Sequence, residues 1–202
     1  VAAAFEFKLH AVGPMVTGGL VVHPFAKARD TLRFYREATR GNSDDLVIFG
    51  ILAYAPDGSG EKIAALVAAH CGSLSDGEAA MRPIKAFGPP IMDVLGSVPY
   101  SALNAMLDIG NPKGALNYWK SSFLTELSDG AIDTMIACFA KCPSPMASLA
   151  LEHLHGAACR IDPAATAFPH RAEGYNFLVV GQWMDPADNG RCIAWARETY
   201  DA

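Results

Sequence analysis

The sequence of 202 residues lacks the motifs through which many proteins bind nucleotide phosphates or activate a serine. It contains no Gly-x-Gly-x-x-Gly, no Gly-x-x-x-x-Gly-Lys-Ser/Thr and no Gly-x-Ser-x-Gly. Its longest apolar runs, such as "IFGILAYA" at residues 48–55, are far too short to span a bilayer. Charges of both signs are interspersed and the net charge is −5, so no basic surface is expected. We therefore expect neither a nucleic-acid partner nor a membrane partner.

Paired cysteines are also missing. The five cysteines are an odd number, and no two of them form a Cys-x-x-Cys pair. Cys138 and Cys142 could share a helix face, and His153 and His155 could share a strand face, but neither pair has a third ligand at matching spacing. We expect no metal site, and we expect reduced thiols in a cytoplasmic protein.

Alternating apolar residues and turn signals predict a mainly antiparallel sheet. Helical periodicity falls between pairs of these strands, for example in the stripe of Phe25, Ala28, Leu32 and Tyr35. Few strand-helix-strand crossovers occur, so the sequence predicts an α+β fold with helices packed on one face, as a single domain over residues 1–202. The predicted strands are residues 5–11, 15–22, 45–54, 62–70, 115–122, 146–154 and 175–183.

Polar residues on two predicted strands are candidates for a site. "YWK" places Tyr118 and Lys120 on one strand face with Trp119 opposite, and "LEHLH" places His153 and His155 opposite Glu152. A lysine near aromatic side chains on a strand can bind an anion or a substrate. It can equally lie at a strand end with its ammonium in solvent. Spacing alone leaves both alternatives open.

Five stretches in order along nearly the whole chain resemble one family, the FAD-linked oxidases of the berberine-bridge-enzyme type. They are "FEFKLHAVGPMVTGG", "LRFYRE", "YWKSSFL", "LEHLHG" and "ATAFPHRAEGYNFLVVGQW". The resemblance implies the substrate-binding domain of a larger, bacterial-type FAD-dependent oxidoreductase, with its flavin-binding segments before and after this one. The implied partners are the flavin-binding domain of the same polypeptide and a small organic substrate. FAD would belong to the full-length parent, and this chain by itself is expected to bind none and to have no turnover.

The resemblance also guides the choice of site residues. Tyr118, Lys120, His153 and Tyr175 are expected to line the substrate pocket together, on the sheet face that covers the flavin, as hydrogen-bonding or orienting groups and not as a base. Plant relatives often carry Glu or Gln where this chain has Leu178, and the glutamate acts as a base there. Leu178 cannot do so, and His155 replaces a glycine of the family pattern. The alternative to an oxidase is a stand-alone α+β ligand-binding or dimerisation module, which should expose a polar sheet face.

Overall fold

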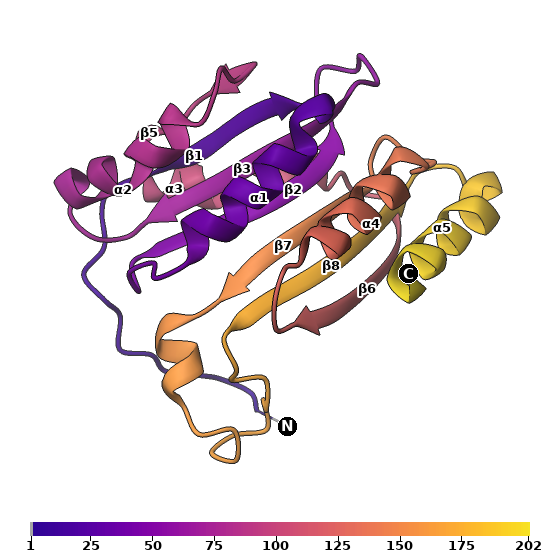
Figure 1. Ribbon diagram of the computed structural model, residues 1–202. Helices are drawn as coiled ribbons and strands as arrows, with labels where there is room; N and C mark the ends of the chain where they lie inside the picture. The colour runs from indigo at the N-terminus through magenta and orange to yellow at the C-terminus, as the bar shows by residue number, and fades with distance from the viewer. Residues whose placement is uncertain (1) are drawn as a thin grey trace.

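The computed structural model describes residues 2–202, which form one antiparallel sheet with helices on its faces (Figure 1). The strands follow the order β4-β1-β3-β2-β7-β8-β6, and β5 pairs with β1 beside β4. The strands are β1 (Met15–Pro24), β2 (Leu46–Tyr54), β3 (Lys62–His70), β4 (Met92–Asp93), β5 (Gly96–Pro99), β6 (Leu116–Leu124), β7 (Ser148–Leu154) and β8 (Gly174–Trp183). The helices are α1 (Ala28–Thr39), α2 (Leu74–Ala86), α3 (Tyr100–Asn104), α4 (Asp129–Ala140) and α5 (Asn189–Asp201). The α+β fold predicted from the sequence is confirmed.

Four helices, α1, α2, α4 and α5, pack on one side of the sheet, which we call the covered face. Leu32 and Tyr35 of α1 and Phe139 of α4 are buried there against Leu52, Leu149 and other strand residues. The Tyr35 hydroxyl donates a hydrogen bond to the Leu151 carbonyl of β7 at 3.1 Å, so its polar atom is satisfied in the core. Burial of this apolar surface is the main source of stability for the fold.

Caps and ion pairs fix the helices locally. Ser128 caps the start of α4, where its hydroxyl accepts a hydrogen bond from the amide of Ala131. For α2 the cap is Ser73, whose hydroxyl accepts a hydrogen bond of 3.1 Å from the amide of Asp76. Arg29 of α1 pairs with Asp133 of α4 through two bonds of 2.6 and 2.8 Å. Arg33 and Arg36 pair with Asp129, at the start of α4, so the two helices run antiparallel side by side.

The chain folds twice along the same path. In the first half a strand, a helix, two strands and a helix (β1, α1, β2, β3, α2) form the sheet order β1-β3-β2. In the second half β6, α4, β7, β8 and α5 form the order β6-β8-β7, and β2 pairs with β7 where the halves meet. The halves therefore share one topology. The two halves of the sequence are similar in outline, although they contain no detectable repeat.

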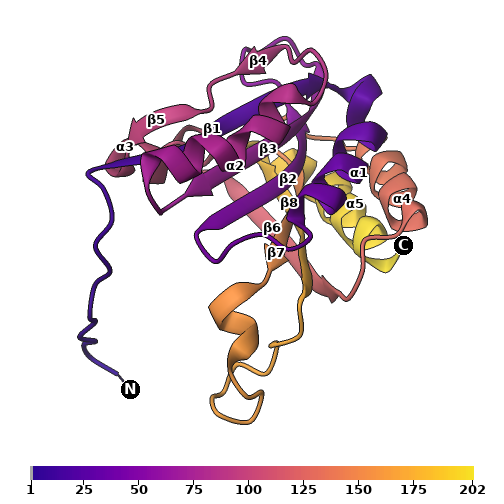
Figure 2. The ribbon, with the colours of Figure 1, turned by 60° about the vertical axis from the view of Figure 1, so that its left-hand side comes forward.

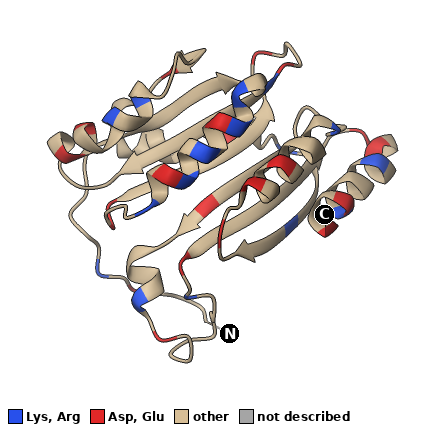
Figure 3. Cartoon of the chain, viewed as in Figure 1, with Lys and Arg blue, Asp and Glu red and all other residues tan. Residues whose placement is uncertain are grey.

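The opposite side of the sheet, which we call the open face, is free of these four helices. Successive strand residues alternate between faces, so the neighbours of the buried covered-face residues point to the open face. Only α3 lies there: the Leu103 side chain packs over Gly18 of β1. Figure 2 shows α1, α4 and α5 together on one side of the strands, and Figure 3 shows that charged residues lie mainly on helices and loops. Within residues 2–202, no helix has the length and apolar character needed to cross a membrane.

Six of the seven predicted strands are present, and the one over residues 5–11 is wrong. Residues 5–11 form no strand, and Phe5, Phe7 and Leu9 are 76%, 74% and 85% exposed. Alternation produces a strand only where a sheet edge is free to pair, and β1 already pairs with β3 on one side and with β4 and β5 on the other. Figure 2 shows the segment running beside the molecule without joining the sheet. The short strands β4 and β5 are absent from the strands predicted from the sequence.

Candidate functional site

Tyr118 and Lys120, two of the predicted pocket residues, lie on the covered face beneath α5. The Nε of Arg197 donates a hydrogen bond of 3.1 Å to the Tyr118 hydroxyl, and this guanidinium lowers the pKa of the phenol. The Lys120 ammonium lies 4.0 Å from the centre of the Tyr200 ring, a cation–π contact. Both residues thus hold α5 against β6.

His153 and Tyr175, the other two predicted residues, lie on the covered face near α1. Their rings are 5.1 Å apart, and the Tyr175 hydroxyl shares a hydrogen bond of 3.2 Å with Thr39. The His153 Nε2 lies 3.4 Å from a carboxylate oxygen of Glu173. Burial and the neighbouring His155 lower the pKa of His153, which favours the neutral imidazole.

The structure does not bring these four residues together. Tyr175 stands opposite Leu124 in the β6–β8 ladder and Tyr118 opposite Gly181, so six residues of β8 separate the two positions. At about 3.3 Å per residue this is roughly 20 Å. The four side chains share one face of the sheet, as predicted, but Tyr118 and Tyr175 lie too far apart to line one pocket wall. The alternation of side chains along a strand shows which residues share a face of the sheet. Only the positions of the helices decide which of the two faces is covered.

The open face of the second half carries a different set of polar side chains. Glu152 of β7 points there, because its neighbours Leu151 and His153 are buried on the covered face. Across the ladder, Asn176 Nδ2 donates a hydrogen bond of 3.3 Å to Glu152 Oε2. Along the six strands of seven or more residues, Glu152 is the only Asp, Glu, Lys, Arg or His with this orientation.

Glu152 lies beside Leu178, the position to which the sequence resemblance assigns a glutamate or glutamine in plant relatives. Leu178 also points to the open face, where it stands opposite Ala150 of β7. Glu152 is two residues further along β7, so it is the diagonal neighbour of Leu178, at about 7–8 Å between Cα atoms. A carboxylate can accept a proton from a reacting group within hydrogen-bond reach. The open face thus offers a proton acceptor one strand away from the unreactive leucine.

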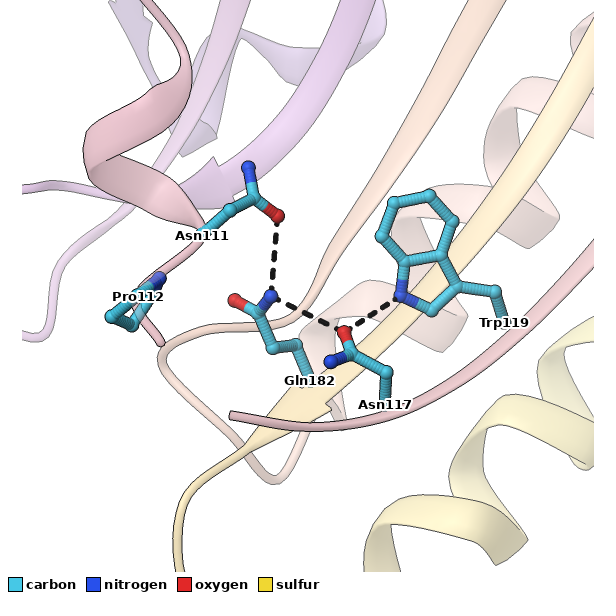
Figure 4. Close-up of a pocket in the computed structure, with 5 residues that line it drawn as sticks. All are labelled: Asn111, Pro112, Asn117, Trp119 and Gln182. Atoms are coloured by element: carbon cyan, nitrogen blue, oxygen red, sulfur yellow. Dashed lines mark hydrogen bonds between the residues drawn. The ribbon is translucent and has the colours of Figure 1, made fainter. Parts of the chain in front are cut away.

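A cavity of about 430 Å³ lies further along the same face, where β6 and β8 meet the loop after α3 (Figure 4). Three amide side chains, a tryptophan and a proline line it. They are Asn111, Pro112, Asn117, Trp119 and Gln182. The alternation of side chains along the strand predicts that Trp119 lies on the other face of β6 from Tyr118 and Lys120. The structure confirms this prediction. Nothing in the sequence brings Asn111 near Gln182, since this depends on how the loop folds back.

The loop between β7 and β8 reaches the open face at the other end of β6. The imidazole of His170 stacks on the Phe123 ring, with centroids 4.0 Å apart and planes 13° apart. Arg171 donates a hydrogen bond of 2.8 Å to the Thr166 hydroxyl and lies over Phe168. His170 and Arg171 therefore serve to order this loop. In the part of the chain that the structure describes, no three His, Cys, Asp or Glu side chains gather as a metal site would require.

Comparisons with known proteins agree with the resemblance seen in the sequence. No protein-family model matches the chain. An FAD-linked oxidoreductase from Dictyostelium discoideum is 22% identical over 198 residues, 97% of this chain and 42% of the relative. A berberine-bridge-enzyme-like protein from Arabidopsis thaliana has a TM-score of 0.75 at 16% identity, over 94% of this chain and 42% of that one. Phl p 4, a grass pollen allergen with glucose dehydrogenase activity, has a TM-score of 0.75 at 17% identity, over 96% and 41%.

This chain spans about two fifths of the length of the proteins that it resembles. The resemblance to FAD-linked oxidases of the berberine-bridge type is confirmed, and the chain has the fold of one segment of such enzymes.

Proposed function

We propose that this chain is the substrate-binding domain of an FAD-dependent oxidoreductase, whose open face covers the flavin and holds a small organic substrate against it. The observation that carries the proposal is the composition of that face. Val22, Ile63 and Ala65 form an apolar cluster there with Leu20, Ile51 and Ala53. Val22, Ile63 and Ala65 are nearly buried, and Leu20, Ile51 and Ala53 are half-buried beside them. An apolar sheet face that none of the four large helices covers favours contact with another part of the working protein. A stand-alone binding module is expected to expose a polar one.

The partner proposed for this surface is the flavin-binding part of the same polypeptide. The length of the chain supports this partner, because the chain spans about 42% of the FAD-linked relative. Apolar strand residues suit one side of a planar flavin ring, whereas the diphosphate of FAD would need a glycine-rich cradle that this sequence lacks. The chain therefore contributes a cover to the cofactor rather than its binding site. The five free cysteines favour a reducing compartment such as the cytoplasm.

Glu152 is the proposed proton acceptor. When bound, the flavin supplies the hydride-accepting chemistry. The substrate must also release a proton, from the hydroxyl or amine whose carbon is oxidised. Glu152 Oε2 is held by Asn176, so the carboxylate is oriented on the open face with its second oxygen available. Leu178 beside it supplies apolar contact to the substrate.

The full-length polypeptide tests the proposal. The encoding gene is expressed in its complete reading frame, and the visible absorption of the purified protein is recorded before and after anaerobic addition of a panel of alcohols, sugars and amines. We expect flavin absorption that bleaches with a substrate. A colourless protein, or a reading frame that starts at Val1, would contradict the proposal and favour the stand-alone module.

A further inference from the structure

Another cavity of about 430 Å³ lies on the covered face, between α1 and the segment that follows α2. Its lining comes from His23 of β1, from one side of α1 with the turn before it, and from residues 87–89. His23 shares its sheet face with Val21, which is buried in the core against α1. The cavity has the size of pockets that bind small molecules. It lies on the opposite side of the sheet from the surface proposed to cover the flavin.

His23 brings an unused hydrogen-bonding atom to this cavity. The residue is only 2% exposed, and its Nε2 is buried without a hydrogen-bond partner within residues 2–202. The imidazole forms a hydrogen bond with the backbone of Pro89, and a proline backbone can only accept. Since Nε2 has no partner, Nδ1 carries the hydrogen in this bond, and Nε2 of the neutral ring is an acceptor.

The surroundings of His23 keep its ring neutral. Burial lowers the pKa of the imidazole by more than the hydrogen bond to Pro89 raises it. A buried acceptor without a partner costs free energy unless a ligand or a water molecule donates to it. The cavity therefore favours a ligand that donates a hydrogen bond.

Two phenylalanines form an aromatic wall beside this acceptor. Phe34 of α1 stacks on Phe87, with ring centroids 4.4 Å apart and planes 18° apart. Phe87 also meets the His23 imidazole edge-on, at 5.1 Å between centroids. Both phenylalanines line the cavity and are only half-buried, so part of their ring surface stays open. Such a surface favours contact with another aromatic ring.

The charged side chains that line the cavity are Lys27, Asp30, Arg33 and Glu37. Each of them has a partner of opposite charge. The ion pairs join Lys27 to Asp30, Arg33 to Asp129, and Glu37 to Arg36 and Arg40. An ionic ligand would give up hydration for charges that are already compensated, which favours a neutral ligand.

We propose that this cavity binds a neutral aromatic molecule whose single N–H or O–H group donates to His23 Nε2 while its ring packs against Phe34 and Phe87. Because the cavity lies under α1 on the covered face, the inference goes beyond the proposed function and does not depend on it. A ligand bound there would leave the open face free for a substrate.

Indole, which is neutral and has one N–H group, is the probe. Its dissociation constant for the full-length polypeptide is measured by ligand-observed NMR. The matched control 1-methylindole keeps the ring system but has no donor, and cyclohexanol has a donor but no aromatic ring. We expect indole to bind at least about tenfold more tightly than either control, the scale of one net hydrogen bond or one aromatic contact.

Variants locate the binding. We expect His23→Leu, which removes the acceptor, and Phe34→Ala, which removes half of the aromatic wall, each to raise the dissociation constant of indole about tenfold or more. His155→Leu, the same change at a histidine outside the cavity, should leave it unchanged. Thermal unfolding of each variant checks that the fold is intact, and the two ligand controls decide the question if a variant does not fold.

Three results would overturn the inference. They are failure of indole to bind, equally tight binding of 1-methylindole or cyclohexanol, and an unchanged dissociation constant in folded His23→Leu and Phe34→Ala. The last result would also identify indole bound elsewhere, for example beside the flavin. Indole binding to a colourless polypeptide would contradict the oxidase alone, whereas a flavoprotein that fails these tests would contradict this site alone.

Discussion

The two halves of the molecule follow the same path but present opposite chemistry on the open face. In the first half the open-face positions of β1, β2 and β3 carry apolar residues that are half-buried or buried, among them Leu20, Ile51 and Ala53. In the second half the corresponding strands β6, β7 and β8 carry amides, a tryptophan and one carboxylate, Glu152. Because the topology is shared, the difference lies in side chains alone. The proposed function assigns contact with the flavin-binding part to the first half and the substrate to the second.

The largest expected effect concerns the single carboxylate. In the full-length enzyme we expect Glu152→Gln to lower kcat/KM by about 10²–10⁴, the range typical of losing a general base. The change keeps the size of the side chain and its contact with Asn176, so stopped-flow measurement of flavin reduction reports on proton transfer. Glu61→Gln, in the loop between β2 and β3 of the first half, is the control and should have no effect. An equal rate in wild type and Glu152→Gln would remove the chemical distinction between the halves.

Contact with the proposed flavin-binding part should depend on the first half of the chain. We expect Ile51→Lys in the full-length polypeptide to weaken contact with the flavin-binding part by about 3–5 kcal/mol, the cost of leaving a buried charge without a partner. The measurements are flavin content per polypeptide and the protease sensitivity of the two parts. Leu74→Lys, at the start of α2 on the covered face, is the matched control. Undiminished flavin content in Ile51→Lys would show that this surface is not an interface.

The covered face should contribute little to activity in either half. We expect Tyr118→Phe and Lys120→Met to leave kcat/KM within about twofold, because their contacts end on Arg197 and Tyr200 of α5. Lys120→Met should lower the free energy of unfolding by about 0.5–1 kcal/mol, the usual size of an exposed cation–π contact. Urea denaturation and steady-state kinetics on the same preparations separate the two effects. A tenfold loss of activity without loss of stability would return both residues to the substrate site.

These comparisons show what the sequence can and cannot specify. Strand parity correctly separates Tyr118 and Lys120 from Trp119, and His153 from Glu152, because side chains alternate along any strand. This alternation does not determine which side of the sheet the helices cover. That depends on the apolar faces of α1, α4 and α5 and on ion pairs such as Arg29–Asp133, which connect residues 104 positions apart. The cavity needs Asn111 to meet Gln182 through a loop, and no local pattern encodes such a contact.

The smallest expected effect is a pH dependence of stability from His153. Burial and His155 lower its pKa in the folded state, while Glu173 opposes the shift. Above the unfolded-state pKa of about 6.5 the imidazole is neutral in both states, and its environment contributes no pH dependence. As the pH falls below that value the unfolded chain binds a proton and the folded chain does not, so stability declines until the folded pKa is reached. Four charged residues line a cavity together with His153: Arg36, Arg40, Glu126 and Glu173. We expect His153→Gln to flatten this decline in urea denaturation between pH 7 and pH 5, whereas His155→Gln, which removes only a neighbour, should reduce it less. An identical pH profile in wild type and His153→Gln would show that this histidine is not held neutral by the covered face.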